Sequence, residues 1–333
     1  MAYAVSLPKL QAYIDQAWVD PIQKSDLIAE VGAVRAQLSN QTARIQPITG
    51  SGRNAKKITT TIYWQDFCSI TPEACSDECT ATTATSDDSE QDVTISGCRQ
   101  VEFAKSMKQF RTVPHNWDMS IALELAANMK ALDEWLNTTY IAFVEANKGT
   151  HEYDLPVGMN DSQDWTIPAE NWDVDLIPEL RLAARFAKFG RPYILDGTNL
   201  WAKVYKAGFY NANADGKGEN ALFNDFPYVF DPLAMADAAP NKTYLINASA
   251  IALLTGNYWG DAREEMAPGH FVYRVQSRNL PGVFYDVHEI QACASNDFVT
   301  SWQIRVNYEF VLNPKGCTST RTGILAFEKG AGA

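Results

Sequence analysis

The sequence predicts an α+β protein in which a long β-hairpin and a long helix precede an α/β unit and a β-rich C-terminal part. Three patterns support this prediction. Two segments dense in β-branched and aromatic residues, 56–67 and 92–110, flank a polar stretch. Apolar residues recur at steps of three and four between 117 and 147, which is the helical period. Apolar and polar residues alternate between 302 and 312, as in a strand with one buried face.

The length and composition are those of a folded protein that lacks a basic surface. A chain of 333 residues can bury a large core, and two or three structural units are expected. Hydrophobic residues make up 46% of the chain, which excludes wholesale disorder. The net charge of −12 argues against sequence-reading contact with nucleic acid, which needs a basic face. It permits a surface that merely lies near nucleic acid.

Neither a targeting segment nor a membrane span is evident in the sequence. Residues 1–21 contain no basic region followed by an apolar core, so they do not form a signal peptide. The longest apolar run, 248–254, is far shorter than the roughly 18 residues of a membrane helix, and it is interpreted as a buried helix turn. We therefore expect a soluble protein, made in the cytoplasm, without membrane contact.

Residues 1–49 are predicted to form an N-terminal arm with two short helices. In the first, Leu10, Ile14 and Trp18 are spaced by one helical turn. The second is predicted to begin at Ser25, with acidic side chains near its start. A glycine-containing linker follows, and then the hairpin.

The segment from Ile58 to Cys98 is chemically unlike the rest of the chain. It has no Lys or Arg and eight acidic residues, so it carries −8 of the net charge of −12. A long hairpin cannot bury itself, and an acidic tip with a basic root suits a hairpin laid across a copy of itself. The residues expected to make these inter-subunit electrostatic contacts are Asp87, Asp88 and Glu90 in the tip, and Arg53, Lys56, Lys57, Lys105, Lys108 and Arg111 at the root.

The helix predicted from Trp117 to about Asn147 is long for a globular protein, at about 45 Å. Beyond it, a short helix is expected between Pro178 and Gly190. Residues 191–205 and 243–259 are then expected to alternate strands with helices. The final part is predicted to consist of strands at 269–275, 282–290 and 302–312.

The sequence contains no motif that predicts catalysis, a cofactor or a metal site, so an enzyme is not expected. The nucleophile elbow, the phosphate-binding loop and the zinc-protease motif are all missing. The four histidines, which are interpreted as structural, are His115, His151, His270 and His288. Asn211 to Gly216 resembles a calcium loop, but Leu222 occupies the position of its bidentate Glu, so a polar turn is preferred.

Four of the six cysteines fall within 31 residues, in the spacing C-x6-C-x3-C-x18-C. Only Cys75 and Cys79 have the close spacing of zinc ligands and no His lies near them, so zinc is disfavoured. Disulfides in the loop are the preferred interpretation, within or between subunits, and free thiols are the alternative. One of three connectivities pairs Cys68 with Cys98 across the strands and Cys75 with Cys79 in a small inner loop.

The order of these elements resembles the major capsid proteins of tailed bacteriophages, which have the Hong Kong 97 type fold. The resemblance covers the whole chain, but it rests on architecture and length. It implies an N-terminal arm at 1–49 and an extended loop at 50–115, followed by a peripheral domain at 116–172 and 270–333 that contains the spine helix. It also implies an axial domain at 173–269, which would meet its copies at the centre of each capsomer.

The resemblance also implies a function and partners. Copies of the chain would form hexamers and pentamers of an icosahedral shell around a double-stranded DNA genome, and would lie close to that DNA without reading it. Only 49 residues precede the loop, so a separate scaffold protein is implied, together with a portal and decoration proteins. The distal loop has no Lys, so the Lys–Asn cross-link that some members form from it is not available there. The protein would be made in the cytoplasm of a bacterial host and reside in the virion.

Two other functional classes were weighed. The first is another virion or surface binding module, carbohydrate-binding for example, because nine Trp and fourteen Tyr provide stacking surfaces, some of them at 164–173. Packing in the core and at interfaces is the simpler role for those aromatic residues. The second class is an enzyme of unrecognised type, for which the sequence offers no set of acid and base groups.

Overall fold

The structure is a computed structural model. It describes residues 12–16, 27–41, 44–45, 58–64, 89–108, 117–151, 159–160, 163–173, 175–190, 192–198, 200, 203, 227–231, 235–236, 241–294, 297–313 and 322–330. Within these residues, no helix is both long enough and apolar enough to cross a membrane.

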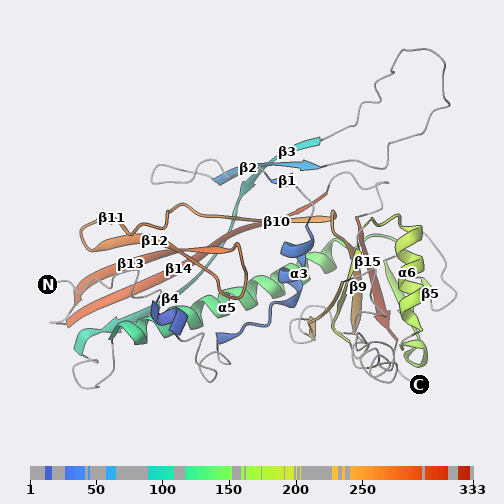
Figure 1. Ribbon diagram of the computed structural model, residues 1–333, viewed down its shortest axis with the longest axis horizontal. Helices are drawn as coiled ribbons and strands as arrows, with labels where there is room; N and C mark the ends of the chain where they lie inside the picture. Colours follow the sequence, from blue (N-terminus) through green and yellow to red (C-terminus); the bar gives the residue numbers. More distant parts are fainter. Residues whose placement is uncertain are drawn as a thin grey trace, which may run out of the picture.

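The fold mixes helices with three antiparallel or mixed sheets (Figure 1). The helices are α3 (Gly32–Asn40), α5 (Trp117–Ala146), the 3-10 turn η1 (Ala169–Asn171) and α6 (Leu176–Phe186). The hairpin sheet consists of β1 (Arg44–Ile45), β2 (Ile58–Trp64) and β3 (Ser89–Ile95). The long-strand sheet consists of β4 (Gly97–Ser106), β10 (Ile251–Gly256), β11 (Glu264–Ala267), β12 (His270–Gln276), β13 (Phe284–Ala294) and β14 (Asp297–Leu312). The short-strand sheet consists of β5 (Met159–Asn160), β6 (Asp164–Ile167), β7 (Pro192–Asp196), β8 (Tyr228–Phe230), β9 (Lys242–Asn247) and β15 (Ile324–Lys329).

The strand β14 organises the long-strand sheet. Its 16 residues pair with β13 and β10 in succession and with β4 along residues 299–308. Trp302, Ile304 and Val306 are buried, so the alternation predicted from the sequence is confirmed for this face. These side chains belong to the same core as the apolar residues of α5.

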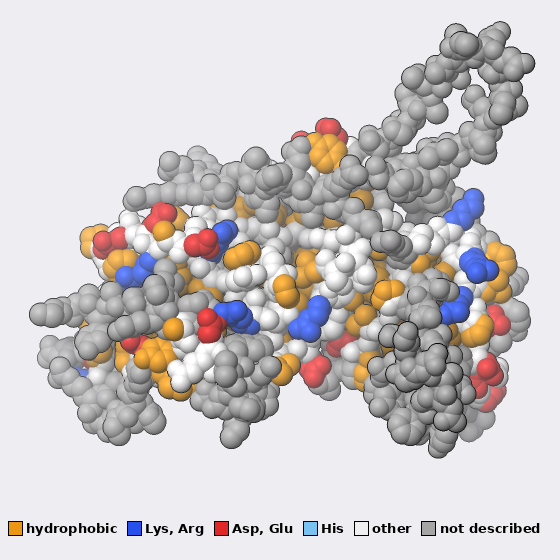
Figure 2. All heavy atoms as spheres, in the orientation of Figure 1, with side chains coloured by type: hydrophobic (Ala, Val, Ile, Leu, Met, Phe, Trp, Pro, Cys, Tyr) orange, Lys and Arg blue, Asp and Glu red, His pale blue; other side chains and the backbone are white. Residues whose placement is uncertain are grey.

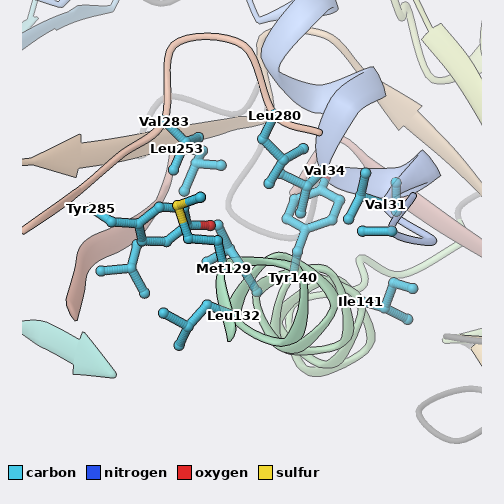
Figure 3. Packing of buried hydrophobic residues seen from close by; sticks show 14 of the residues in the cluster. Val31, Val34, Met129, Leu132, Tyr140, Ile141, Leu253, Leu280, Val283 and Tyr285 are labelled. Atoms are coloured by element: carbon cyan, nitrogen blue, oxygen red, sulfur yellow. The ribbon is translucent and has the colours of Figure 1, made fainter. Parts of the chain in front are cut away.

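The helix α5 has 30 residues and ends one residue before the predicted limit, so the sequence-based prediction is confirmed. Figure 3 shows its side chains packed against residues of α3, β10 and the connection between β12 and β13. At its C-terminal end α5 reaches the short-strand sheet, whose Tyr193, Tyr244 and Ile246 join the same core. The opposite face of that sheet packs on α6 through Ile194 and Leu245.

The predicted return strand 92–110 is divided in two. Its first part, β3, pairs with β2, and its second part, β4, leaves the hairpin and pairs with β14. Ser96 lies between them, and its backbone N–H and hydroxyl donate to Glu309 Oε2 at 3.0 and 2.8 Å. Pairing with β14 supplies ten more residue pairs to the long-strand sheet, so tertiary contacts override the local preference for one continuous strand.

The helix predicted from Ser25 is not continuous. Ser25 lies outside the described residues, Leu27 is helical, residues 28–31 are irregular, and α3 begins at Gly32. The first amides of α3 are bound by distant side chains: Ala33 N donates to Asp231 Oδ2 at 3.0 Å, and Val34 N donates to Asn137 Oδ1 at 3.0 Å. These partners cap the helix at a position that the local sequence does not specify. Of the predicted first helix, residues 12–16 are described as helical and Ile14 is buried.

The interpretation of 248–254 as a helix turn is also wrong. Residues 248–250 form a turn, closed by Ala250 N donating to Asn247 O at 2.9 Å, and β10 follows. At this turn the chain passes from β9 in the short-strand sheet to β10 in the long-strand sheet. Both faces of β10 are covered, which gives it the continuous apolar sequence that cannot be distinguished from a buried helix by periodicity.

The two large sheets combine strands that are distant in the sequence. The strands β10 and β11 lie in the same sheet as β12 to β14. The last strand, β15, pairs with β6 and β9 in the short-strand sheet. The chain therefore passes between the two large sheets after β9 and again before β15.

We expect Gly256→Ala to detach the hairpin from the long-strand sheet. A Cβ at this position would lie 2.8 Å from Ile58 Cγ2 and 2.8 Å from Ile95 Cδ1. Overpacking of this kind costs about 1–3 kcal/mol. Hydrogen exchange of residues 58–64 and 89–95 should become faster, while exchange in α5 is unchanged. Gly260→Ala is the matched control, because a Cβ there meets nothing within 4 Å. Equal exchange in the two variants would contradict this account of the hairpin root.

Candidate assembly surfaces

The root of the hairpin has one apolar and one polar face. The apolar side chains of β2 and β3, among them Ile58, Ile62 and Val93, form a separate small core with Ala252 and Leu254 of β10. The hairpin was expected to need another subunit to bury it, but this face is covered by the chain's own sheet. The other face bears the exposed residues Thr59, Glu90, Asp92 and Thr94. The acidic face of the described root is therefore the one available to a partner.

The residues predicted to make inter-subunit electrostatic contacts are only partly described. Glu90 is exposed on β3. Lys105 on β4 forms an ion pair with Glu124 of α5, with 3.1 Å between Nζ and Oε2. Lys108 is exposed, and its backbone N–H donates to Asp297 Oδ1 at 3.1 Å. The predicted residues outside the described part are Arg53, Lys56, Lys57, Asp87, Asp88 and Arg111.

Glu90 and Lys105 do not meet within one subunit. Glu90 lies toward the outer end of the hairpin, opposite Tyr63, whereas Lys105 lies near the far end of β4, opposite Thr300. At about 3.3 Å per residue, β4 alone carries the chain about 30 Å away from the root. Any contact between these two residues is therefore a contact between subunits, and it stays a prediction.

Cys98 is the only one of the four loop cysteines in the described part of the chain. It is an exposed free thiol on β4, opposite Asn307 of β14. The other three, which lie outside the described residues, are Cys68, Cys75 and Cys79.

The pairing of Cys68 with Cys98 stays a prediction, because Cys68 lies outside the described residues. Disulfides between subunits likewise stay a prediction.

A polar stripe on α5, which was not predicted, holds the N-terminal segment 27–41. It consists of Asp133, Asn137 and Tyr140, spaced by four and three residues on one face of the helix and all buried. Asn137 binds Val34 N and donates from Nδ2 to Asp231 Oδ2 at 2.7 Å. The Tyr140 hydroxyl donates to Gln37 Oε1 at 3.0 Å. A polar pair at 133 and 137 beside the apolar positions 132 and 136 was the signal that could have revealed the stripe.

Asp133 accepts hydrogen bonds from three different side chains. Its carboxylate accepts hydrogen bonds from Ser277 Oγ at 2.9 and 3.0 Å, from Asn279 Nδ2 at 3.0 Å, and from the Tyr285 hydroxyl. Asn279 in turn accepts from Ala29 N at 3.1 Å. Burial raises the pKa of Asp133 from 3.8 to about 6, although each of these donors acts to lower it. The site thus links α5, the N-terminal segment and the connection between β12 and β13 through one buried carboxyl.

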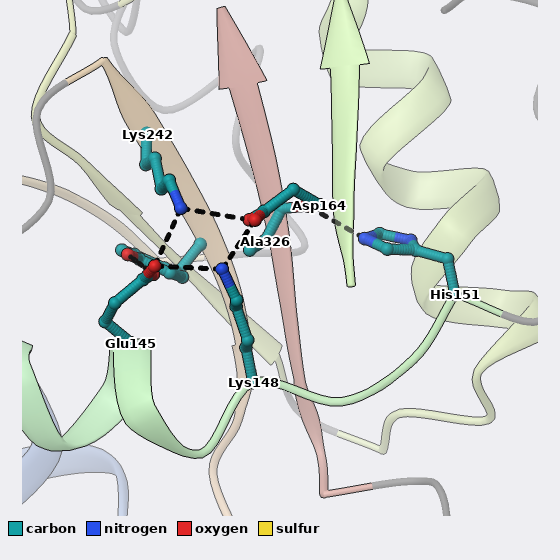
Figure 4. A network of polar contacts seen from close by, with 7 residues as sticks. Glu145, Lys148, His151, Asp164, Lys242 and Ala326 are labelled. Carbon is teal, nitrogen blue, oxygen red and sulfur yellow. Dashed lines mark hydrogen bonds and ion pairs between the residues drawn. The ribbon is translucent and has the colours of Figure 1, made fainter. Parts of the chain in front are cut away.

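An ion-pair cluster joins α5 to the short-strand sheet (Figure 4). Lys242 Nζ lies 2.7 Å from Glu145 Oε1 and 3.1 Å from Asp164 Oδ1, and Lys148 Nζ lies 2.9 and 2.5 Å from the same two carboxylates. Burial acts to raise the pKa of Glu145, but hydrogen bonds from Lys242, Tyr244 and Lys148 outweigh it and lower that pKa. The cluster fixes the last turn of α5 against β6 and β9.

Two of the histidines, far apart in the sequence, meet in the structure. His270 Nε2 lies 3.1 Å from His288 Nδ1 on neighbouring strands. Burial lowers the pKa of His288 to about 4, and the charge of Arg305 acts in the same direction. His151 Nε2 bonds Ala326 O at 2.8 Å, and His115 lies outside the described residues. Among the described residues no group of three or more His, Cys, Asp or Glu is arranged to hold a metal ion.

Comparison with known proteins gives structural neighbours only. No protein-family model matches the chain, and no curated protein matches it. A capsid structure of cyanophage P-SCSP1u matches with a TM-score of 0.45 and 10% identity over 85% of this chain and 86% of that one. A structure from Mycobacterium phage Adephagia has a TM-score of 0.43 and 12% identity over 92% and 91% of the two chains. A structure of the mature capsid of bacteriophage PhiM1 matches with a TM-score of 0.42 and 10% identity, over 84% of each chain.

We expect Asp133 to make the protein more stable at acidic than at neutral pH. Its pKa is higher in the folded state than in the unfolded state, so folding takes up a proton. Its contribution to the free energy of unfolding, about 3 kcal/mol, is fully present below the unfolded pKa of 3.8. This contribution is lost as the pH rises to about 6, the pKa of Asp133 in the folded state. Chemical denaturation of the wild type and of Asp133→Asn over this range measures it. The Asn variant should lose this part of the pH dependence, and an unchanged profile would contradict the assignment.

We expect Lys242→Met to lower the free energy of unfolding by about 1–2 kcal/mol, because it removes two partly buried ion pairs and leaves Lys148 alone between two carboxylates. The matched control is Lys130→Met, which removes a looser and more exposed pair with Glu134 at 3.8 Å. Its cost should stay below about 0.5 kcal/mol. Equal losses in the two variants would show that the junction cluster does not stabilise the fold.

Proposed function

We propose that this chain is the major capsid protein of a tailed phage, with the Hong Kong 97 type fold. In this proposal its copies form hexamers and pentamers of an icosahedral shell around the double-stranded DNA genome. The observation that carries the proposal is the arrangement around α5. One helix of 30 residues lies against the long-strand sheet, reaches the short-strand sheet at its end, and follows a hairpin rooted on the first of these sheets.

The parts of the molecule then take the following roles. The hairpin belongs to the extended loop, and α5 is the spine of a peripheral domain built on the long-strand sheet. The short-strand sheet and α6 form the axial domain. By their sheets, β4, β10 and β11 join the peripheral domain, and β5, β6 and β15 join the axial domain. The rest of 50–115 belongs to the extended loop.

The use of the buried polar groups supports a structural role. Asp133, Asp231 and Asp286 are buried, and each accepts hydrogen bonds from other elements of the chain. Buried networks whose members are bonded to one another rigidify a fold and specify one arrangement. A shell subunit, which must present the same surfaces in every copy, needs this property.

Partners and location follow from the proposed role. We expect a separate scaffold protein, a portal and decoration proteins, and a location in the virion after synthesis in the bacterial cytoplasm. The loop cysteines are proposed to fasten neighbouring subunits, because Cys98 is an exposed free thiol within one chain.

Sedimentation of the purified protein, with negative-stain imaging of the fast fraction, tests the proposal. Closed shells or hexameric rings are the expected result, and dissociation by reductant would assign the cysteines to fastening them. A monomer or dimer under all conditions, even with a candidate scaffold protein added, would exclude a capsid role.

We expect the simultaneous substitution Asp87→Lys, Asp88→Lys and Glu90→Lys to impair assembly without unfolding the subunit. The loop would lose its attraction to basic side chains of a neighbour. Each exposed pair contributes only about 0.2–1 kcal/mol, but the contact is repeated in every subunit. The yield of shells by sedimentation and the thermal unfolding midpoint measure the two effects. Glu264→Lys on the exposed strand β11 is the control for a change of net charge. Shells in normal yield from the triple variant would refute the electrostatic contact.

A further inference from the structure

His270 of β12 and His288 of β13 face each other on the side of the long-strand sheet that points away from α5. His270 lies opposite Ile290 and His288 lies opposite Val272, so the two imidazoles are diagonal neighbours on one face of paired strands. Tyr273, which points to the other face, belongs to the core around α5. Seven consecutive register pairs join the two strands, so the sheet itself sets the separation of the two rings.

The two rings bond to each other and leave their tautomers open. His270 Nε2 lies 3.1 Å from His288 Nδ1, and the ring centroids are 5.3 Å apart. Within the described residues neither ring makes another hydrogen bond. A neutral imidazole carries its proton on either nitrogen, so both facing nitrogens are free to present a lone pair to the same point. A metal ion at that point takes the place of the proton that the two nitrogens otherwise share.

The spacing of the facing nitrogens is that of two ligands on one metal ion. A Zn–N bond is about 2.0–2.1 Å long, so tetrahedral geometry places two such nitrogens about 3.3 Å apart, and octahedral geometry places neighbouring ones about 3.0 Å apart. The observed 3.1 Å lies between these values. His288 is 9% exposed and His270 is half-buried, so an ion enters from the side of His270.

The surroundings of the pair provide no competing acidic site. The edge of Trp259 packs on the ring of His288, with 6.2 Å between the ring centroids. Arg305 lies on the same face, opposite Asp286, and its positive charge acts on His288. On the face of the molecule shown in Figure 2, the acidic side chains of the described residues are interspersed with basic and apolar ones. A cation held by the pair therefore depends on the imidazole nitrogens and binds against the charge of Arg305.

We propose that His270 Nε2 and His288 Nδ1 together bind Zn²⁺ or a similar late transition-metal ion, with water in the remaining coordination positions. Imidazole nitrogen is a preferred ligand of these ions. Because the chain provides two ligands, the ion exchanges with the solvent. When bound, it joins β12 to β13 beside the turn at Gly269 and stabilises that end of the long-strand sheet. The metal site does not depend on the capsid role.

Calorimetric titration of the whole chain with ZnCl₂ tests the site. His270→Gln and His288→Gln should each weaken the binding of Zn²⁺ at least about tenfold, because Gln stays polar but lacks the imidazole nitrogen. Comparison with the unmodified chain separates this site from the cysteines, which also bind Zn²⁺. Circular dichroism confirms folding, and the half-buried position 270 provides the test if the His288 variant does not fold.

Mg²⁺ prefers oxygen ligands, so it is the control for the acidic segment 58–98 and should bind equally to the three chains. Equal affinity for Zn²⁺ in the unmodified chain and the folded variants would overturn the proposal. So would the absence of Zn²⁺ binding by the unmodified chain.

Arg305→Gln tests the site without removing a ligand. Loss of its positive charge should strengthen the binding of Zn²⁺ at least about threefold, whereas a loss of folding would weaken it. Lys130→Gln removes one positive charge from α5 and is the matched control, which should leave the affinity unchanged. Unchanged or weaker binding in the folded Arg305 variant would overturn the assignment of Zn²⁺ to this pair of histidines.

Discussion

The burial of α5 is the constraint on which the rest of the molecule depends. A helix of 30 residues cannot bury its apolar stripe against any single neighbour of ordinary size. Here the stripe is covered by the long-strand sheet along most of its length, by α3 on another side, and by the short-strand sheet at its end. Each of these elements comes from a different part of the sequence. Their positions relative to one another are thus set by their common contact with one rigid rod.

Apolar burial alone would leave the position of the N-terminal segment along α5 poorly specified, because the hydrophobic effect is not directional. The hydrogen bonds of the buried polar stripe fix that position. Asn137 accepts from the first turn of α3, and Gln37 receives the Tyr140 hydroxyl while its own amide donates to Ile251 O at 2.6 Å. A shift of α3 by one residue would leave several of these groups buried without a partner, each at a cost of about 1–3 kcal/mol. At the other end of α5, the charged cluster around Glu145 and Lys242 has the same effect on the short-strand sheet.

The features that could be predicted from the sequence are those with a strong local period. The helix from Trp117 and the alternating strand at 302–312 were both found, because burial of one face imposes spacings of 3.6 and 2 residues. The start of α3 could not be found in this way, since it depends on Asp231, which is 198 residues away. The strand β10 was missed for a different reason. Both of its faces are covered, so apolar and polar residues do not alternate along it.

The root of the hairpin shows how a few residues determine where the acidic loop begins. After β3 the chain must change from the hairpin sheet to the long-strand sheet within one residue, Ser96, which Glu309 holds through two hydrogen bonds. Gly97 follows because a Cβ there would lie 2.5 Å from the carbonyl oxygen of Tyr308. Gly256 leaves the space that Ile58 and Ile95 occupy. With both glycines and the Ser96 contact in place, the root is fixed in position and direction on β10 and β14. In the proposed assembly a charged loop can reach a neighbouring subunit reproducibly only from such a fixed root, so we expect these small residues, and not the acidic ones, to set the geometry of that contact.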